Sequence, residues 1–287
     1  ANRDFRRFVA GQFVTNAGDS LYTVAVLWLV YQLSGSATLV GVTNAILLLP
    51  WLLQAVAGPI VDRFPIGPLL VGSQLVQGVV VLVFPLAAVF DRLGVDLILG
   101  VVPVLMLATL VMAPMQAAVV PRVVEDDRLS TANSALATVT LGFDMLFDAV
   151  GGGLIALFGT TALFVADAVT FALAALLFHR MVVPESSAES ASAVSAESVA
   201  SAFRSYVGDM REGVEILRGT VFVELMLTTA VANFATGVTL AILPAFGDAI
   251  AGPAVYGLML GALGTGRLLG SVIGPRFEGV GYGQFLV

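Results

Sequence analysis

The sequence predicts an all-α membrane protein, a polytopic helical bundle with eight transmembrane helices, and three observations support this. Hydrophobic residues make up 58% of the 287 residues and charged residues only 11%, whereas a soluble domain usually carries about 25% charged residues. Apolar runs long enough to cross a bilayer core of about 30 Å recur along the chain. These runs lack the alternation of apolar and polar residues that a lipid-facing strand requires, so helices are predicted rather than strands.

The apolar runs account for most of the chain. A window of about 19 residues finds them at Phe8–Leu33, Ala37–Ile60, Leu69–Phe90, Leu97–Val120, Leu136–Leu157, Ala162–Phe178, Val221–Phe246 and Val255–Ile273. The first run is too long for a cleavable signal peptide and holds the polar residues Asn16 and Asp19 near its middle. We therefore expect it to remain in the protein as a membrane helix.

The arginines predict the orientation of the chain. All 13 basic residues are arginines. If the N-terminus lies in the cytoplasm, eleven of them fall on the inner side, while Arg92 alone lies outside and Arg267 lies within a span. Membrane proteins show this excess of positive charge on the cytoplasmic side. The sequence thus predicts a multi-pass protein of the cytoplasmic membrane with its N-terminus inside.

Composition divides the chain into three predicted parts. Residues 1–181 hold six spans and are expected to form an N-terminal six-helix bundle. Residues 182–218 are expected to be a cytoplasmic linker, because residues 184–201 are rich in serine, alanine and glutamate and cannot bury a core. Apolar residues recur every three or four positions from Phe203 to Leu217, which predicts an amphipathic helix, either on the inner membrane surface or packed against the bundle. Residues 219–287 are expected to begin a C-terminal bundle with two helices.

Two features indicate a duplicated architecture that continues beyond the given sequence. The segment GPIVDRF at Gly58–Phe64 has a faint echo in GSVIGPRF at Gly270–Phe277, and each ends the second span of its predicted half. Duplicated halves are typical of secondary transporters. The chain starts at Ala1 and stops at Val287 inside GYGQFLV, which can open a ninth apolar run. We therefore expect a piece of a longer protein.

Several segments resemble the major facilitator superfamily of secondary transporters. They are similar to the bacterial and archaeal branch that includes the enterobactin exporter and multidrug exporters, and they are FRRFVAGQFVTNAGDSLYTVAVLWLVYQLSGSA at Phe5–Ala37, LSTANSALA at Leu129–Ala137 and LFVADAVTFALAAL at Leu163–Leu176. The resemblance implies two six-helix halves, of which this chain would hold the first two thirds. It also implies transport of a small molecule by alternating access, with no enzymatic activity, cofactor, metal or nucleic-acid partner.

The superfamily's marker is a loop of the form G-x-x-x-D-R-x-G-R-R between the second and third helices. Gly58, Asp62 and Arg63 match it, whereas Pro, Ile and Gly at residues 65–67 replace its glycine and two basic residues. The resemblance implies a gating loop in which Asp62 accepts hydrogen bonds from helix N-termini or from an arginine across the two halves. An ordinary solvated turn is the alternative.

The fifth span departs from a glycine pattern that exporters of the superfamily carry, G-x-x-x-G-P-x-x-G-G. If Gly152 and Gly153 are the last two glycines, Ala149 stands where proline is expected. Asp144 and Asp148 then occupy the two preceding glycine positions. A face that would permit close helix contact has become a face of carboxylates.

Three aspartates are predicted near mid-membrane, where ionisable groups are costly and usually functional. Asp144 and Asp148 are four residues apart and lie on one side of their helix. Both cannot comfortably ionise in an apolar environment, so at least one is expected to hold a proton, as a proton-coupled carrier requires. Asp19 is the third. The alternative is a structural role, with hydrogen bonds from Asn44, Gln54, Thr138 or Thr140.

Arg267 is the one cation predicted inside the bilayer. Since the fifth and eighth helices are neighbours in the superfamily, we expect Arg267 to pair with Asp144 or Asp148 in one state, and protonation of the carboxylate to release it. Asn16 and Asn233 are expected to face a central cavity with these charges.

Other residues in the spans receive structural interpretations. Asp167 is expected to be structural, because the sixth helix is peripheral in the superfamily. Trp28 is expected to be an anchor at the membrane interface. Four glycines along the eighth span form pairs spaced four residues apart and are expected to permit close helix contact, namely Gly257, Gly261, Gly266 and Gly270.

The sequence therefore predicts a secondary active transporter, with proton-coupled efflux as the favoured mechanism. Cysteine is absent, which excludes thiolate chemistry, and no nucleotide-binding glycine loop suggests ATP hydrolysis. The expected partners are a small-molecule substrate, protons and the lipid bilayer. The alternatives are a non-transporting scaffold or sensor and a membrane-embedded lipid enzyme, although an enzyme needs clustered reactive groups at the water-lipid boundary. The substrate, the coupling ion and the oligomeric state are left open.

Overall fold

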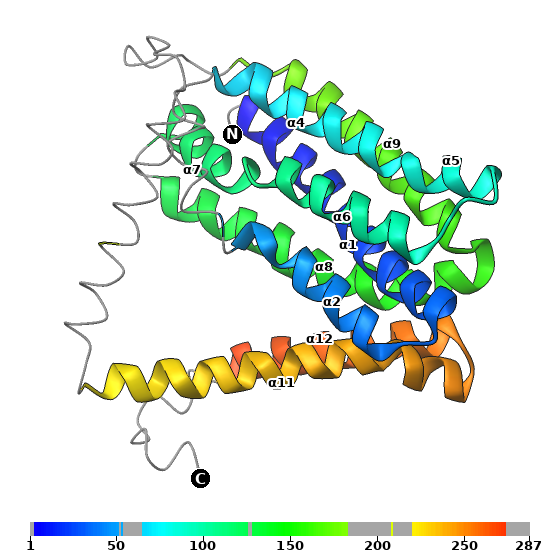
Figure 1. The fold of residues 1–287 in the computed structure, drawn as a ribbon. Coiled ribbons are helices and arrows are strands. Elements are labelled where there is room, and N and C mark those ends of the chain that lie inside the picture. Colours follow the sequence, from blue (N-terminus) through cyan, green and yellow to red (C-terminus); the bar gives the residue numbers. More distant parts are fainter. Residues whose placement is uncertain are drawn as a thin grey trace.

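The computed structural model describes residues 3–51, 53, 65–125, 128–182, 208 and 220–273, without the side chains of 138–145, 268, 271 and 272. Every regular element in these ranges is a helix, and the helices form a bundle (Figure 1). They are α1 (Arg3–Ser34), α2 (Ala37–Leu47), α4 (Ile66–Val81), α5 (Val83–Val89), α6 (Val95–Thr109), α7 (Met112–Val123), α8 (Leu129–Phe158), α9 (Thr160–His179), α11 (Val221–Ile250) and α12 (Pro253–Ile273). The predicted all-α fold is confirmed.

Prolines divide two of the predicted spans into shorter helices. A proline has no N–H to donate to the carbonyl four residues earlier, and its ring crowds that carbonyl. Pro85 follows the break between α4 and α5 at Leu82, and Pro114 follows the break between α6 and α7. Each pair of helices together fills one predicted span.

Five helical segments are long and apolar enough to cross a membrane. They are Arg3–Ser34, Ile66–Val89, Val95–Val123, Thr160–His179 and Val221–Ile250. The other three predicted spans each include residues or side chains outside the described part of the chain. Two of these appear there as shorter apolar helices, Ala37–Trp51 and Leu146–Phe158.

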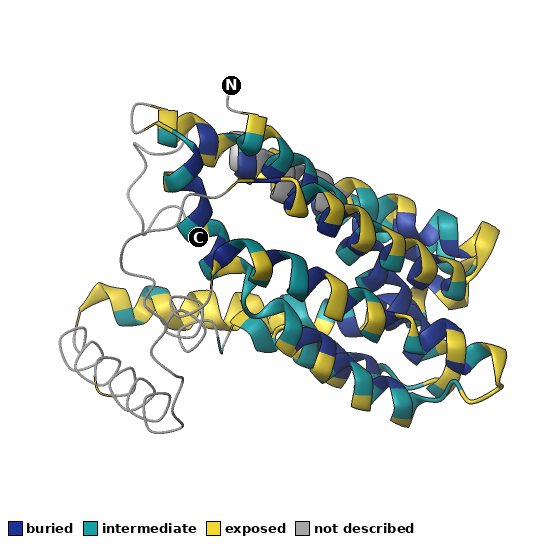
Figure 2. Ribbon diagram, turned by 90° about the horizontal axis from the view of Figure 1, so that it is seen from above, coloured by how far each residue is buried: buried dark blue, intermediate teal, exposed yellow. Residues whose placement is uncertain are grey.

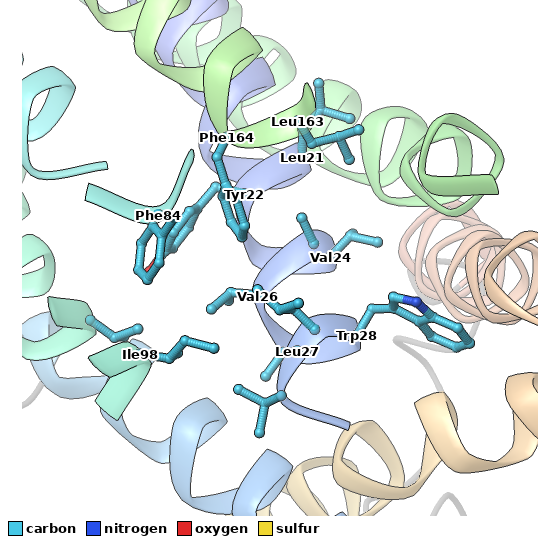
Figure 3. Packing of buried hydrophobic residues seen from close by; sticks show 14 of the residues in the cluster. Leu21, Tyr22, Val24, Val26, Leu27, Trp28, Phe84, Ile98, Leu163 and Phe164 are labelled. Atoms are coloured by element: carbon cyan, nitrogen blue, oxygen red, sulfur yellow. The ribbon is translucent and has the colours of Figure 1, made fainter. Parts of the chain in front are cut away.

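The core of the bundle is built around α1. Tyr22 of α1 packs against Phe84 of α5 and Phe164 of α9, with ring centroids 4.8–6.1 Å apart among the three (Figure 3). Near its start, α1 meets α9 again, where Phe8 and Phe178 lie 5.9 Å apart between centroids. These contacts fix the long helix α1 against α9 over most of its length.

Hydrogen bonds between buried side chains also hold α1 in place. Gln12 donates to Gln116 of α7 over 2.9 Å, and Thr15 donates to Gln74 of α4 over 3.0 Å. Gln74 and Thr15 are both buried. Amide and hydroxyl groups inside a membrane bundle must find such partners, because lipid offers none. The rotation of α1 about its axis is therefore fixed.

Helices α11 and α12 form a hairpin in which α12 packs along α8, whereas α11 packs on the rest of the bundle only near its end. Gly252, with φ of 85°, makes the turn between them. The buried residues of α11 are Ala241, Leu243, Pro244 and Gly247, all near that turn. From residue 221 to residue 240 no residue is buried (Figure 2), and the start of this stretch lies apart from helices α1 to α9 (Figure 1). The two parts of the chain thus meet at the end where α1 finishes.

The prediction that Trp28 is a membrane-interface anchor is wrong. Trp28 is only 2% exposed, and its indole stacks on Tyr256 of α12 with centroids 5.7 Å apart and planes 24° apart. The aromatic pair joins α1 to α12 near the turn of the hairpin. Its burial follows from the close approach of these two helices.

The described helices are compatible with the three predicted parts but do not test the boundaries. Helices α1 to α9 lie within residues 1–181, and α11 and α12 lie within residues 219–287. The predicted amphipathic helix from Phe203 to Leu217 lies outside the described residues, apart from Gly208.

Candidate functional site

A cavity of about 100 Å³ lies where the two parts of the chain meet. Helices α1, α2, α8, α11 and α12 all contribute to its wall. Leucine and valine side chains make up much of the lining, and the polar residues are Thr23, Asn44, Asp148, Tyr256 and Arg267. An apolar lining with a few polar groups is typical of small-molecule sites, which usually enclose about 300–1,000 Å³, so this cavity is smaller than a complete substrate site.

Asp148 is the carboxylate of this site. Its Oδ1 accepts a hydrogen bond of 2.5 Å from the hydroxyl of Ser20, which ties α8 to α1. Across the cavity the positive charge of Arg267 acts on the same carboxylate, although no ion pair joins these two described residues. The structure thus brings together two of the predicted residues, one from each part of the chain.

Asp148 reaches α12 because α8 and α12 approach closely one turn further along. A Cβ atom on Gly152 would lie 2.2 Å from the carbonyl oxygen of Pro253 and 2.5 Å from the Cα of Gly257. A Cβ atom on Gly261 would lie 2.6 Å from that of Ala149. Only glycine permits this backbone contact, so the predicted packing role is confirmed for Gly257 and Gly261. The prediction is wrong for Gly266 and Gly270, because a Cβ atom there would have no described neighbour within 4 Å.

Asp19 lies on another side of α1. It is half-buried and is not among the described residues that line the cavity. The negative charge of Asp19 instead interacts electrostatically with Asp167 of α9 and with Tyr22. Asn16, one turn earlier, is half-buried, and its Nδ2 is enclosed without a hydrogen-bond partner. The structure therefore separates Asp19 from Asp148, because Ser20 rather than Asp19 is the residue of α1 that contacts Asp148.

One further predicted residue does not line the cavity, and the others lie outside the part of the chain that the structure describes. Asn233 is exposed on the free stretch of α11 and does not line the cavity. The side chain of Asp144 is outside the described part, and so is the whole predicted gating loop, Gly58, Asp62 and Arg63.

A larger hollow of about 660 Å³ lies near the start of α8, lined by Phe5, Glu125 and Arg128 among others. Glu125 and Arg128 form an ion pair of 3.6 Å, but both side chains are more than half exposed. Exposed ion pairs contribute little free energy and bind weakly. The smaller cavity lies where the two parts of the chain meet and combines a half-buried carboxylate with an arginine from the other part, so it is the better candidate site.

Sequence reasoning missed Ser20 and Tyr256. Ser20 follows Asp19 and differs from it by about 100° around the helix, so one of the two can face α8 while the other faces α9. Which residue faces which helix depends on the rotation of α1, and the sequence carries no signal for that rotation. Tyr256 stands next to Gly257, and the close packing of that glycine buries it.

A family model for transmembrane secretion effectors, of the major facilitator type, matches residues 1–280. The chain belongs to this family. No curated protein matches the chain. The major facilitator prediction is confirmed, while the narrower likeness to enterobactin and multidrug exporters stays a prediction.

As a major facilitator protein, the chain is a multi-pass membrane transporter, and its substrate is a small molecule. The cavity lies between the part that holds α1 to α9 and the part that holds α11 and α12. A carboxylate and a guanidinium that face each other there can exchange partners with a proton or with a charged group of a substrate.

Proposed function

We propose that this transporter exports its substrate across the cytoplasmic membrane by alternating access, driven by proton antiport. The observation that carries the proposal is that Asp148 and Arg267, from the two parts of the chain, face one cavity. In this account the N-terminus lies in the cytoplasm, as the arginines predict. Residues 1–181 and 219–287 act as the two moving parts, joined by residues 182–218.

The uneven packing of the two parts supports alternating access. At one end they are in close contact through Trp28 with Tyr256 and through Gly152 with Gly257. At the other end the first twenty residues of α11, from residue 221, include no buried position. A carrier that rocks about a central site needs one such closed end at a time. With the N-terminus inside, the closed end is the outer one.

Proton coupling follows from competition for the Asp148 carboxylate. A carboxylate in an apolar cavity is stabilised either by a proton or by a nearby cation. When Asp148 is ionised, Arg267 moves into contact and draws α12 toward α8. When Asp148 binds a proton, Arg267 is released and the two helices can separate. Proton movement is thereby linked to the relative position of the two parts.

Two observations favour export over import, namely the description of the family and the similarity of the first helix to that of exporters. The family description names secretion, and the segment Phe5–Ala37 is similar to that of exporters. In an antiport cycle the proton and the substrate displace one another, so a substrate group that interacts with Asp148 leaves when the proton arrives. This makes a cationic or hydrogen-bond-donating substrate the natural competitor of the proton.

The test is an accumulation assay in cells that express the complete protein. The probes are ethidium, a catecholate siderophore and a labelled sugar, each measured with and without a proton uncoupler. We expect lower accumulation of at least one probe than in cells with an empty vector, and loss of that difference with the uncoupler or in the Asp148→Asn variant. Export that persists with the uncoupler would contradict proton antiport.

A further inference from the structure

Asp167 forms a second buried acidic site, away from the cavity. It lies on α9, and its side chain has no exposed surface. The hydroxyl of Thr170 donates to the Asp167 carbonyl over 2.7 Å and lies 3.3 Å from Oδ1. The second carboxyl oxygen, Oδ2, is also buried and has no hydrogen-bond partner among the residues that the structure describes. An ionised carboxylate with one oxygen unpaired is costly in an apolar environment.

The groups on α1 that face Asp167 add no positive charge. Gly18 lets the carboxyl group rest on the α1 backbone, since a Cβ there would lie 2.4 Å from Oδ1. Asp19 adds a second negative charge that acts on Asp167. The hydroxyl of Tyr22 is buried beside them without a partner. The described face of α1 thus presents acidic and neutral groups only.

The other helices packed against α9 offer no cation either. The sequences of α4 and α5 contain no titratable residue. The titratable residues of helix α8 are the aspartates at 144 and 148, and Asp148 accepts a hydrogen bond from Ser20. Among the described residues around α9 at this level, the charged groups are all carboxylates.

We propose that Asp167, together with Asp19, forms a proton-binding site between α1 and α9, distinct from the cavity at Asp148. One proton removes the charge that no described cation compensates, and it lowers the repulsion between the carboxylates of Asp167 and Asp19. A proton needs almost no space. A metal ion would need several oxygen ligands around it, and the described residues hold no group of three or more His, Cys, Asp or Glu side chains that could bind one.

The site lies next to the candidate transport site through α1. Asp19 acts on Asp167, and the next residue, Ser20, donates to Asp148. Loss of the proton would leave two like charges across the contact between α1 and α9. Their repulsion would strain the contact that holds Ser20 against α8, so the two sites would affect each other through the position of α1.

Infrared spectroscopy of the purified complete protein tests this site without any substrate. We expect a carbonyl stretch of a protonated carboxylic acid at neutral pH that is lost in Asp167→Asn and retained in Asp148→Asn. Tyr22→Phe keeps the ring contacts with Phe84 and Phe164 and should shift the frequency of that stretch by removing the adjacent hydroxyl. This second variant serves if Asp167→Asn does not fold.

Two results would overturn the site. One is a set of carboxylic-acid bands that is the same in wild type, Asp167→Asn and Tyr22→Phe. The other is thermal stabilisation by sodium ions in the wild type that disappears in Asp167→Asn, which would make this a sodium site. Because the measurements involve no transport, failure of the export proposal leaves their outcome unaffected.

Discussion

Asp148 and Asp167 are two aspartates inside one bundle, and their surroundings differ in every respect that matters for function. Asp148 is half-buried, faces a cavity and lies within the influence of Arg267. Asp167 has no exposed surface and meets another carboxylate, a glycine and a tyrosine. The comparison teaches that an acidic residue in a membrane helix gains its role from the neighbouring helix. Asp148 borders α12 in the other part of the chain, whereas Asp167 borders α1 within its own part.

The largest expected effect is that of Asp148→Asn on proton-driven transport. The variant can neither bind a proton nor attract Arg267. Coupling between two sites typically amounts to about 1–3 kcal/mol, so the proton-driven rate should fall by up to about a hundredfold. Uptake or export in proteoliposomes with an imposed pH gradient measures this. The matched control is Asp91→Asn in an exposed turn with φ of 52°, which asparagine tolerates well. Wild-type rates in Asp148→Asn would refute the coupling role.

A smaller but still large effect is expected when the contact between the two parts is forced apart. Gly152→Leu places a side chain where a Cβ already lies 2.2 Å from a backbone oxygen. Overpacking costs about 1–3 kcal/mol, so thermal melting in detergent should lower Tm by several degrees, and transport should fall. Gly153→Leu is the control, since nothing lies within 4 Å of a Cβ there. Equal effects of the two variants would show that the close contact does not matter.

A moderate effect is expected from Ser20→Ala, which removes the hydrogen bond to Asp148 and keeps the cavity. A hydrogen bond to a charged group contributes about 1.5–3 kcal/mol, and part of this should appear as a decrease of about tenfold or less in the proton-driven rate. The pH dependence of the rate should also change, because Ser20 stabilises the ionised form of Asp148. Thr43→Val removes a buried hydroxyl bonded only within its own helix and should leave the pH profile unchanged.

The smallest expected effect is spectroscopic and uses the two tryptophans of the chain. Trp28 is 2% exposed and stacked on Tyr256, whereas Trp51 is 73% exposed. In Trp51→Phe the remaining fluorescence should resist quenching by acrylamide, and in Trp28→Phe it should be quenched readily. Quenching of Trp28 that rises when the pH is lowered would sharpen the account, since protonation is expected to loosen the contact between α1 and α12. Equal quenching of both variants contradicts the closed end.

The spans were predictable because bilayer thickness dictates the length of apolar helices. The predicted run Ala162–Phe178 and the observed α9, Thr160–His179, differ by two residues or fewer at each end. The glycines of α12 were predictable for the same kind of reason, since their spacing of four fixes one face of a helix. The spacing of the glycines does not say which helix they contact. The contact of Gly257 with Gly152 of α8 is seen only in the structure.

The site was predictable only in part, because helix rotation is set by packing. Asp148 and Arg267 were named from their rarity in apolar spans, and they do share a cavity. Asp19 was expected beside them, but the bonds of Gln12 and Thr15 to neighbouring helices turn α1 so that Asp19 acts on Asp167. Asn233 was expected in the cavity, yet α11 packs only through residues nearer its end.

The most direct test of the account is the water accessibility of the two aspartate positions. The sequence contains no cysteine, so Asp148→Cys and Asp167→Cys can each be treated with a membrane-impermeant thiol reagent in detergent and in inside-out vesicles. The account predicts that Cys at 148 reacts, faster than Cys at 167 by at least about tenfold, since one side chain borders the cavity and the other has no exposed surface. An unreactive residue at 148, or equal rates at both positions, would contradict it.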